Sequence, residues 1–156
     1  LKPDGTVNRG AVAGLVFGHP NERRALEAIV FPIIGRLATA AIAEGRTDPN
    51  ARFVVLDAAV LLEAGWDRVA DKLIYVDAPR KVRLERVAAR SGWSDADLSA
   101  REAAQWPAEK KIARADAVVT NDGPAENVEA QVDALLKDWK LLPSMVAENE
   151  CPAPPG

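Results

Sequence analysis

The sequence contains one cysteine and one histidine among 156 residues. A disulfide framework needs several cysteines, and a zinc site needs clustered cysteine and histidine ligands, so these residues support neither. Cys151 lies in the proline-rich stretch ENECPAPPG, and His19 stands before a proline with no partner for nucleophilic catalysis nearby. The low cysteine content favours a reducing, cytoplasmic setting.

A net positive charge is absent, and aromatic side chains are scarce. The formal net charge is -3, the isoelectric point is about 5.3, and aromatics make up 5% of the chain. A general nucleic-acid binder would carry a basic face, so we expect no nucleic-acid partner. The longest apolar runs, such as 53-FVVLDAAVLL-62, are short and interrupted, so we expect no membrane partner.

What is present is an alternation of strand-like and helix-like segments. The apolar, β-branched runs 52–58, 72–78 and 117–120 predict buried strands. Runs that are apolar on both faces are typical of parallel strands covered by helices, and 59–70 is long enough for a crossover. The sequence therefore predicts an α/β fold with a mostly parallel sheet.

Helices are expected around the strands. One follows the Asp4-Gly5 turn and ends at Gly18, a second runs from an Asn21 cap through a bend at Pro32 to Gly45, and a third occupies 124–142. The polar helical stretch near 92–115, broken at Pro107, predicts a lid over the site. Together these segments form one domain over 1–142, followed by a proline-rich tail over 143–156 that we expect to be disordered.

Polar residues stand where the predicted strands end. Asp57, Asp77 and Asn121 occupy these positions, and ligands of α/β sheets bind beyond the carboxyl ends of strands. Asp57 suits either the orientation of a water or hydroxyl or a turn cap. The stretch 121–123 suits either a turn and cap before the following helix or a segment whose backbone groups recognise a nucleotide base.

Three arginines, Arg83, Arg86 and Arg90, share one helix face after Asp77. Guanidinium groups match phosphate oxygens, so the face fits a polyanion; the alternative is a solvated face paired with Glu85 or with acids of the lid. The lid contributes a second basic set, which consists of Arg101, Lys110, Lys111 and Arg114. Basic residues on a mobile lid are typical of phosphoryl-transfer enzymes, although surface solubility explains them equally.

An ordered series of motifs resembles the dephospho-coenzyme A kinase family over roughly residues 4 to 140. The motifs are 4-DGTVNR-9, 31-FPII-34, 54-VVLDAAVLLEAGWD-67, 74-IYVDAP-79 and 105-QWPAEKKIARADAVVTNDG-123. The resemblance implies a P-loop NTPase-type parallel sheet with flanking helices and a helical lid. It also implies transfer of the γ-phosphoryl of ATP to the ribose 3′-hydroxyl of dephospho-CoA, the last step of coenzyme A biosynthesis, with Mg²⁺ as cofactor.

Carried over position by position, the resemblance implies two groups of site residues. On the ATP side, those that face phosphates, brace the lid or border the adenine are Arg86, Arg90, Gln105, Lys111, Arg114, Asn121 and Gly123. On the dephospho-CoA side stand Arg9, Leu61, Leu62 and Glu63. Two positions depart from the family: Phe31 replaces a usual histidine, and Ala59 replaces a usual proline.

A further departure is the absence of the phosphate-binding motif GxxxxGK[ST], with its Mg²⁺-holding hydroxyl, anywhere in the sequence. In the family this motif lies on a first, central strand, between the strands expected at 53–57 and 72–77, and an acidic pair that serves the acceptor hydroxyl follows it. We therefore expect a fragment whose first strands, P-loop and Mg²⁺ ligands are missing, and which is marginally stable and inactive alone.

Two other functions remain open from the sequence. Another small-molecule P-loop kinase, for a nucleoside monophosphate or for shikimate, shares the fold, although DGTVNR and LLEAGWD argue against it. A non-catalytic binding module that keeps the lid without a P-loop is the second. Oligomeric state is not indicated by the sequence.

Overall fold

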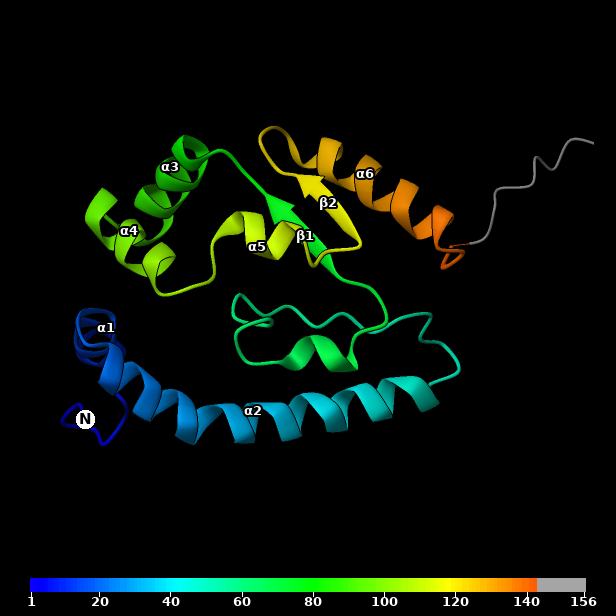
Figure 1. The fold of residues 1–156 in the computed structure, drawn as a ribbon. Coiled ribbons are helices and arrows are strands. Elements are labelled where there is room, and N and C mark those ends of the chain that lie inside the picture. The colour runs from blue at the N-terminus through cyan, green and yellow to red at the C-terminus, as the bar shows by residue number, and fades with distance from the viewer. Residues whose placement is uncertain (143–156) are drawn as a thin grey trace, which may run out of the picture.

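The computed structural model describes residues 1–142 of the chain, and the predicted tail lies outside them. Two parts are evident in Figure 1: a long helix with its preceding short helix along one edge, and a small sheet with its helices on the opposite side. The irregular segment 48–73 runs between them. The site is built from side chains of this segment and of the sheet's helices.

The first part consists of α1 (Arg9–Gly18) and α2 (Pro20–Thr47), which pack on each other. The side chain of Asn8 accepts a hydrogen bond from the N–H of Ala11 and so caps α1. The predicted helix end at Gly18 is confirmed. The predicted cap at Asn21 is wrong, because Pro20 begins α2 with its fixed φ and its missing N–H is not needed there.

The helix α2 is continuous through Pro32 and ends two residues after the predicted Gly45. It is also long and apolar enough to cross a membrane by length and composition, with a mean hydropathy of 1.7 over its most apolar window. None of that window is buried. The core helix of a soluble protein meets the same test, so the feature by itself does not assign α2 to a membrane.

The second part contains the sheet. Strands β1 (Ile74–Asp77) and β2 (Ala117–Thr120) pair in parallel, with Asp77 opposite Thr120 at their carboxyl ends. Val119 of β2 is completely buried, and α6 (Ala125–Asp138) packs against this strand. Both strands and their parallel pairing were predicted, and the α/β fold class is confirmed.

The connection between the strands is helical, as predicted for the lid. It consists of α3 (Arg80–Ser91), α4 (Asp95–Ala103) and α5 (Ala108–Ile112), with the break between the last two at Pro107. In Figure 1 these helices lie on one side of β1, and α6 lies beside β2. Within this connection, Arg86 of α3 reaches the loop that follows β2.

The predicted strand at 52–58 is not formed. Its residues are in no helix or strand, and Val55 is 73% exposed. A strand requires a neighbour that satisfies its N–H and C=O groups, and within residues 1–142 β1 pairs only with β2. The expected crossover at 59–70 is correspondingly a set of turns with one short 3-10 helix, η1 (Trp66–Val69).

Candidate functional site at the strand ends and the lid

The carboxyl ends of the two strands lie together. The N–H of Asn121 donates a hydrogen bond of 2.7 Å to the carbonyl of Asp77. The expectation that these two residues share one edge is therefore confirmed. Asp57 lies in the segment without strand structure, so it does not end a strand.

Arg86 of α3 binds the loop that follows β2. Its Nη1 donates to the carbonyl of Asn121 at 3.0 Å and to Oδ1 of the same residue at 2.9 Å, and Nη2 lies 3.5 Å from the carbonyl of Gly123. Three of the residues predicted for the ATP side thus form one cluster. A planar guanidinium presents its donors in a rigid fork, a geometry that the ammonium group of a lysine does not reproduce.

The other two arginines of this face behave differently. Arg83 forms an ion pair with Glu102 of the lid at 3.1 Å, as the solvated-face alternative anticipated. Arg90 is exposed in the last turn of α3, and it has no hydrogen-bond or ion-pair partner among residues 1–142. Of the three, Arg90 is therefore the one whose guanidinium is most available to an anion.

Lys111 joins the lid to the segment after residue 58. It is 8% exposed, and its Nζ lies 3.0 Å from the carbonyl of Ala59, 2.8 Å from Oε1 of Gln105 and 2.9 Å from Oε1 of Glu63. An ammonium group has three donors, and all three are used here. We call Glu63, Gln105 and Lys111 the lid node.

The lid node unites residues that the sequence reasoning assigned to opposite substrates. Glu63 was expected beside dephospho-CoA, and Lys111 was expected to face ATP phosphates or brace the lid; in the structure the two side chains bind each other. Oε1 of Glu63 also accepts from the N–H of Trp106 at 2.7 Å, whereas Oε2 is buried without a hydrogen-bond partner in the described chain. Leu61 and Leu62, the neighbours of Glu63, are buried in the core.

The remaining lid cations are also engaged. Arg114 binds Asp67 of η1 at 2.6 Å, and Lys110 lies over the ring of Trp106 with its Nζ 3.5 Å from the centroid. Arg101 lies against two aromatic rings. In this arrangement Lys111 and Arg114 both attach the lid to the segment 48–73, Lys111 from a buried position and Arg114 from an exposed one.

Burial acts to raise the pKa of Glu63 and is the largest single influence on it. Hydrogen bonds from the N–H of Trp106 and from Lys111 together outweigh burial, so the pKa lies below its ordinary value of 4.5. A carboxyl group whose pKa is lowered on folding stabilises the fold above its unfolded pKa, and that contribution is lost as the pH falls through the folded pKa.

We therefore expect Glu63→Gln to reduce the free energy of unfolding most above pH 4.5. Below that pH the difference from the native chain should shrink, because the native carboxylate becomes protonated. Urea unfolding at a series of pH values measures this difference, and Glu129→Gln on the exposed surface of α6 provides the background pH dependence. A difference that grew on acidification would contradict the ion pair.

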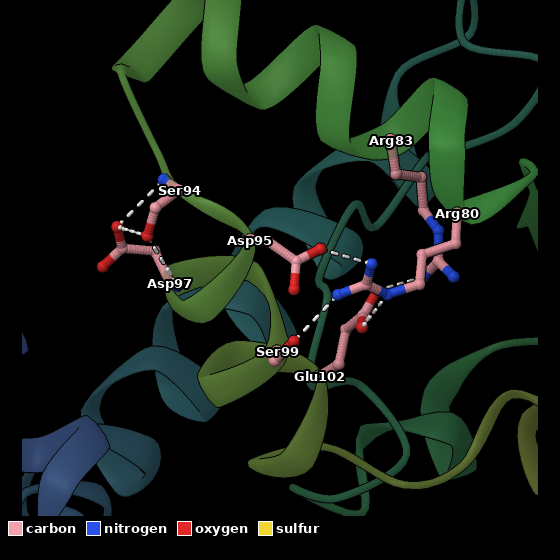
Figure 2. A network of polar contacts seen from close by, with 7 residues as sticks. All are labelled: Arg80, Arg83, Ser94, Asp95, Asp97, Ser99 and Glu102. Atoms are coloured by element: carbon pink, nitrogen blue, oxygen red, sulfur yellow. Dashed lines mark hydrogen bonds and ion pairs between the residues drawn. The ribbon is translucent and has the colours of Figure 1, made fainter.

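A second network, which the sequence reasoning missed, joins α3 to α4 (Figure 2). Arg80 binds Asp95 at 2.6 Å, Ser99 at 2.8 Å and Glu102 at 3.3 Å, and Glu102 also pairs with Arg83. The bond to Asp95 raises the pKa of Arg80, and the same bond lowers the pKa of Asp95. These directional bonds fix α4 on α3.

A signal for Arg80 was present in the sequence. A positive charge in the first turn of a helix opposes the helix dipole, so an arginine there indicates partners elsewhere. The acidic residues of the lid, which follow within 22 positions, supply them.

The expected dephospho-CoA positions are divided between the first part of the fold, which holds Arg9, and the segment 48–73, which holds residues 61–63. Arg9 is exposed as the first residue of α1. Phe31, the departure from the usual histidine, packs edge-on against Trp66 with ring centroids 5.3 Å apart. These two aromatics line an open groove along α2 together with Gly35, Arg36 and Ala64.

No group of three or more potential metal ligands gathers within residues 1–142. The described side chains therefore do not form a cluster that would hold Mg²⁺ by protein ligands alone.

Comparison with known proteins gives a consistent result. A family model described as dephospho-CoA kinase matches residues 1–127. The dephospho-CoA kinase of Geobacter metallireducens is 41% identical over 88% of this chain and 68% of its own length, and that of Geobacillus kaustophilus is 35% identical over 91% and 70%.

Solved structures agree with these matches. The crystal structure of TT1252 from Thermus thermophilus is 38% identical, with a TM-score of 0.68 over 86% of this chain and 68% of that one. The chain spans from 56 to 70% of the length of the curated relatives that it matches. The family match covers most of the chain, and the two relatives named above are both dephospho-CoA kinases. The chain belongs to the dephospho-CoA kinase family.

Proposed function

We propose that the protein phosphorylates the ribose 3′-hydroxyl of dephospho-CoA with ATP, with its two substrates held on opposite sides of the lid node. The family to which it belongs consists of kinases of the last step of coenzyme A biosynthesis. ATP occupies the side formed by α3 and residues 121–123. Dephospho-CoA occupies the side formed by α1 and residues 61–63.

The observation that carries this proposal is the cluster of Arg86, Asn121 and Gly123 at the strand ends. Ligands of parallel sheets bind at this edge, and the cluster holds the loop after β2 in one conformation there. The loop then offers backbone groups to the adenine. Arg90, which is exposed on the same helix, is available to phosphate oxygens.

The lid completes the arrangement on this proposal. Phosphoryl transfer requires that water be kept from the γ-phosphoryl group, and a lid achieves this only if it is held in place. Lys111 and Arg114 attach it to Glu63 and Asp67. Oε2 of Glu63 has no hydrogen-bond partner within residues 1–142, and a hydroxyl or amide N–H of dephospho-CoA would satisfy it.

The 156 residues contain no GxxxxGK[ST] run, so the cradle for the β- and γ-phosphates and the Mg²⁺ ligands lie outside them on this proposal. The low cysteine content and the small-molecule substrates support a cytoplasmic location. Neither nucleic acid nor a membrane is needed for the reaction.

A substrate panel tests the proposed function. The product of the complete reading frame is incubated with ATP and Mg²⁺, and ADP release is measured with dephospho-CoA, AMP, CMP or shikimate as acceptor. We expect turnover with dephospho-CoA alone. Turnover with a nucleoside monophosphate or shikimate would support a different P-loop kinase, and ATP binding without any transfer would support a non-catalytic module.

A further inference from the structure

The side chain of Arg101 lies between two aromatic rings that come from different parts of the fold. Its Cζ is 3.6 Å from the ring centroid of Trp93 and 4.5 Å from that of Phe17. Arg101 belongs to α4 of the lid, Phe17 to α1, and Trp93 to the link between α3 and α4. We call these three residues the arginine clasp.

Trp93 is held firmly in position. Gly92 before it adopts the left-handed conformation, with φ of 66°, and the N–H groups of Gly92 and Trp93 donate to carbonyls at the end of α3. Ser94 after it caps α4, and its N–H and hydroxyl both donate to the carboxylate of Asp97. The indole is therefore a fixed wall against which Arg101 stacks.

The clasp and the network of Arg80 attach α4 in different ways. The clasp holds α4 to α1 by a cation-aromatic contact between Arg101 and Phe17. Such a contact needs no aligned donor-acceptor pair, so it stays attractive when the guanidinium shifts across the ring. The Arg80 network holds α4 to α3 by directional charge-assisted bonds. If the lid changes position, we therefore expect α4 to stay attached to α3. The change in position would then occur between α4 and α1, at the clasp.

The Arg101 side chain is 20% exposed, and its Nη1 donates to the carbonyl of Asp97 within α4 at 2.9 Å. Its charge is therefore partly removed from water, which strengthens the attraction to the rings. Because α1 carries Arg9 at its start and Phe17 near its end, a ligand that fixes α1 also fixes one wall of the clasp.

We propose that Arg101 is a positioning residue that couples the two substrate sites: dephospho-CoA bound beside α1 orders the lid through the clasp and thereby strengthens ATP binding. The proposal rests on the division of substrates set out above. Coupling of this kind is reciprocal, so ATP must strengthen the binding of dephospho-CoA by the same factor.

The test measures the Kd of ATP by calorimetry with and without saturating dephospho-CoA, using the product of the complete reading frame. In the native protein we expect dephospho-CoA to lower the Kd of ATP. Arg101→Met should reduce this coupling factor by about fivefold, the equivalent of losing one to two cation-aromatic contacts. The Kd of ATP alone should change little, which separates coupling from general damage to the ATP site.

Three further variants sharpen the test. Phe17→Leu should reproduce the loss, and Arg101→Lys should retain part of the coupling because an ammonium group still binds aromatic faces. Arg24→Met removes a positive charge whose hydrogen bond is to Asn21 within α2, and it should keep the native factor. A native factor of one, or a native factor in Arg101→Met, would overturn the proposal. Failure of the native protein to bind either substrate would instead overturn the proposed function.

Discussion

Lys111→Met is expected to lower the free energy of unfolding by about 3 kcal/mol, because it leaves the carboxylate of Glu63 without its charged partner in a largely buried position. The side chains of the two residues are only 10% and 15% exposed. Removing one member of a buried pair is far more damaging than removing a surface charge, which changes stability by less than about 0.5 kcal/mol. Urea unfolding followed by circular dichroism measures the difference.

Two variants make this prediction specific. Lys81→Met, which removes an exposed lysine of α3, should leave the unfolding midpoint nearly unchanged. Combining Lys111→Met with Glu63→Leu should recover part of the lost stability, because an apolar pair leaves no buried charge. If the double variant were as unstable as the sum of both single changes, the lid node would not be held by its ion pair.

Arg86→Met is expected to reduce kcat/KM for ATP by about 100-fold or more in the product of the complete reading frame, since the loop at 121–123 loses its bonds to α3 and the site loses a guanidinium. Stability should change little, because Arg86 is exposed. Initial rates over a range of ATP concentrations give the value.

The conservative variant distinguishes charge from geometry. Arg86→Lys keeps the charge but cannot hold both oxygens of Asn121 together with the Gly123 carbonyl, so it should remain strongly impaired. Glu85→Gln, the exposed neighbour on the same helix, should behave like the native protein. A loss of less than threefold in Arg86→Met would mean that this residue braces the surface without contributing to catalysis.

The pattern of residue types along the chain predicted the elements that form from local sequence or that have a pairing partner in the structure. The helix end at Gly18, the strand at Ile74–Asp77 and the break at Pro107 follow from residue type and spacing. The stretch 52–58 has an equally strong strand pattern but is not a strand. A strand forms only where an adjacent strand pairs with its backbone, and the residue pattern of one segment does not show whether such a strand is present.

Arg86 and Asn121, which bind each other, were both expected on the ATP side, Arg86 from its place on a basic helix face and Asn121 from its place after a strand. The partners of Lys111 and Arg80 were not predicted. They lie from 6 to 52 residues away along the chain, and the tertiary fold brings them together. The three arginines on one face of α3 also differ in their partners, which residue type and spacing did not indicate. Arg86 binds the loop after β2, Arg83 binds a lid carboxylate, and Arg90 binds no protein group within the described chain.

The division of the two substrates is tested most directly by amide hydrogen exchange on the product of the complete reading frame, with ATP or dephospho-CoA added singly. The account predicts that ATP slows exchange in α3 and residues 121–123, and that dephospho-CoA slows it in α1 and residues 61–65. If ATP slowed exchange in α1 but not in α3 and residues 121–123, or if dephospho-CoA slowed it in residues 121–123 but not in α1, the account would be contradicted.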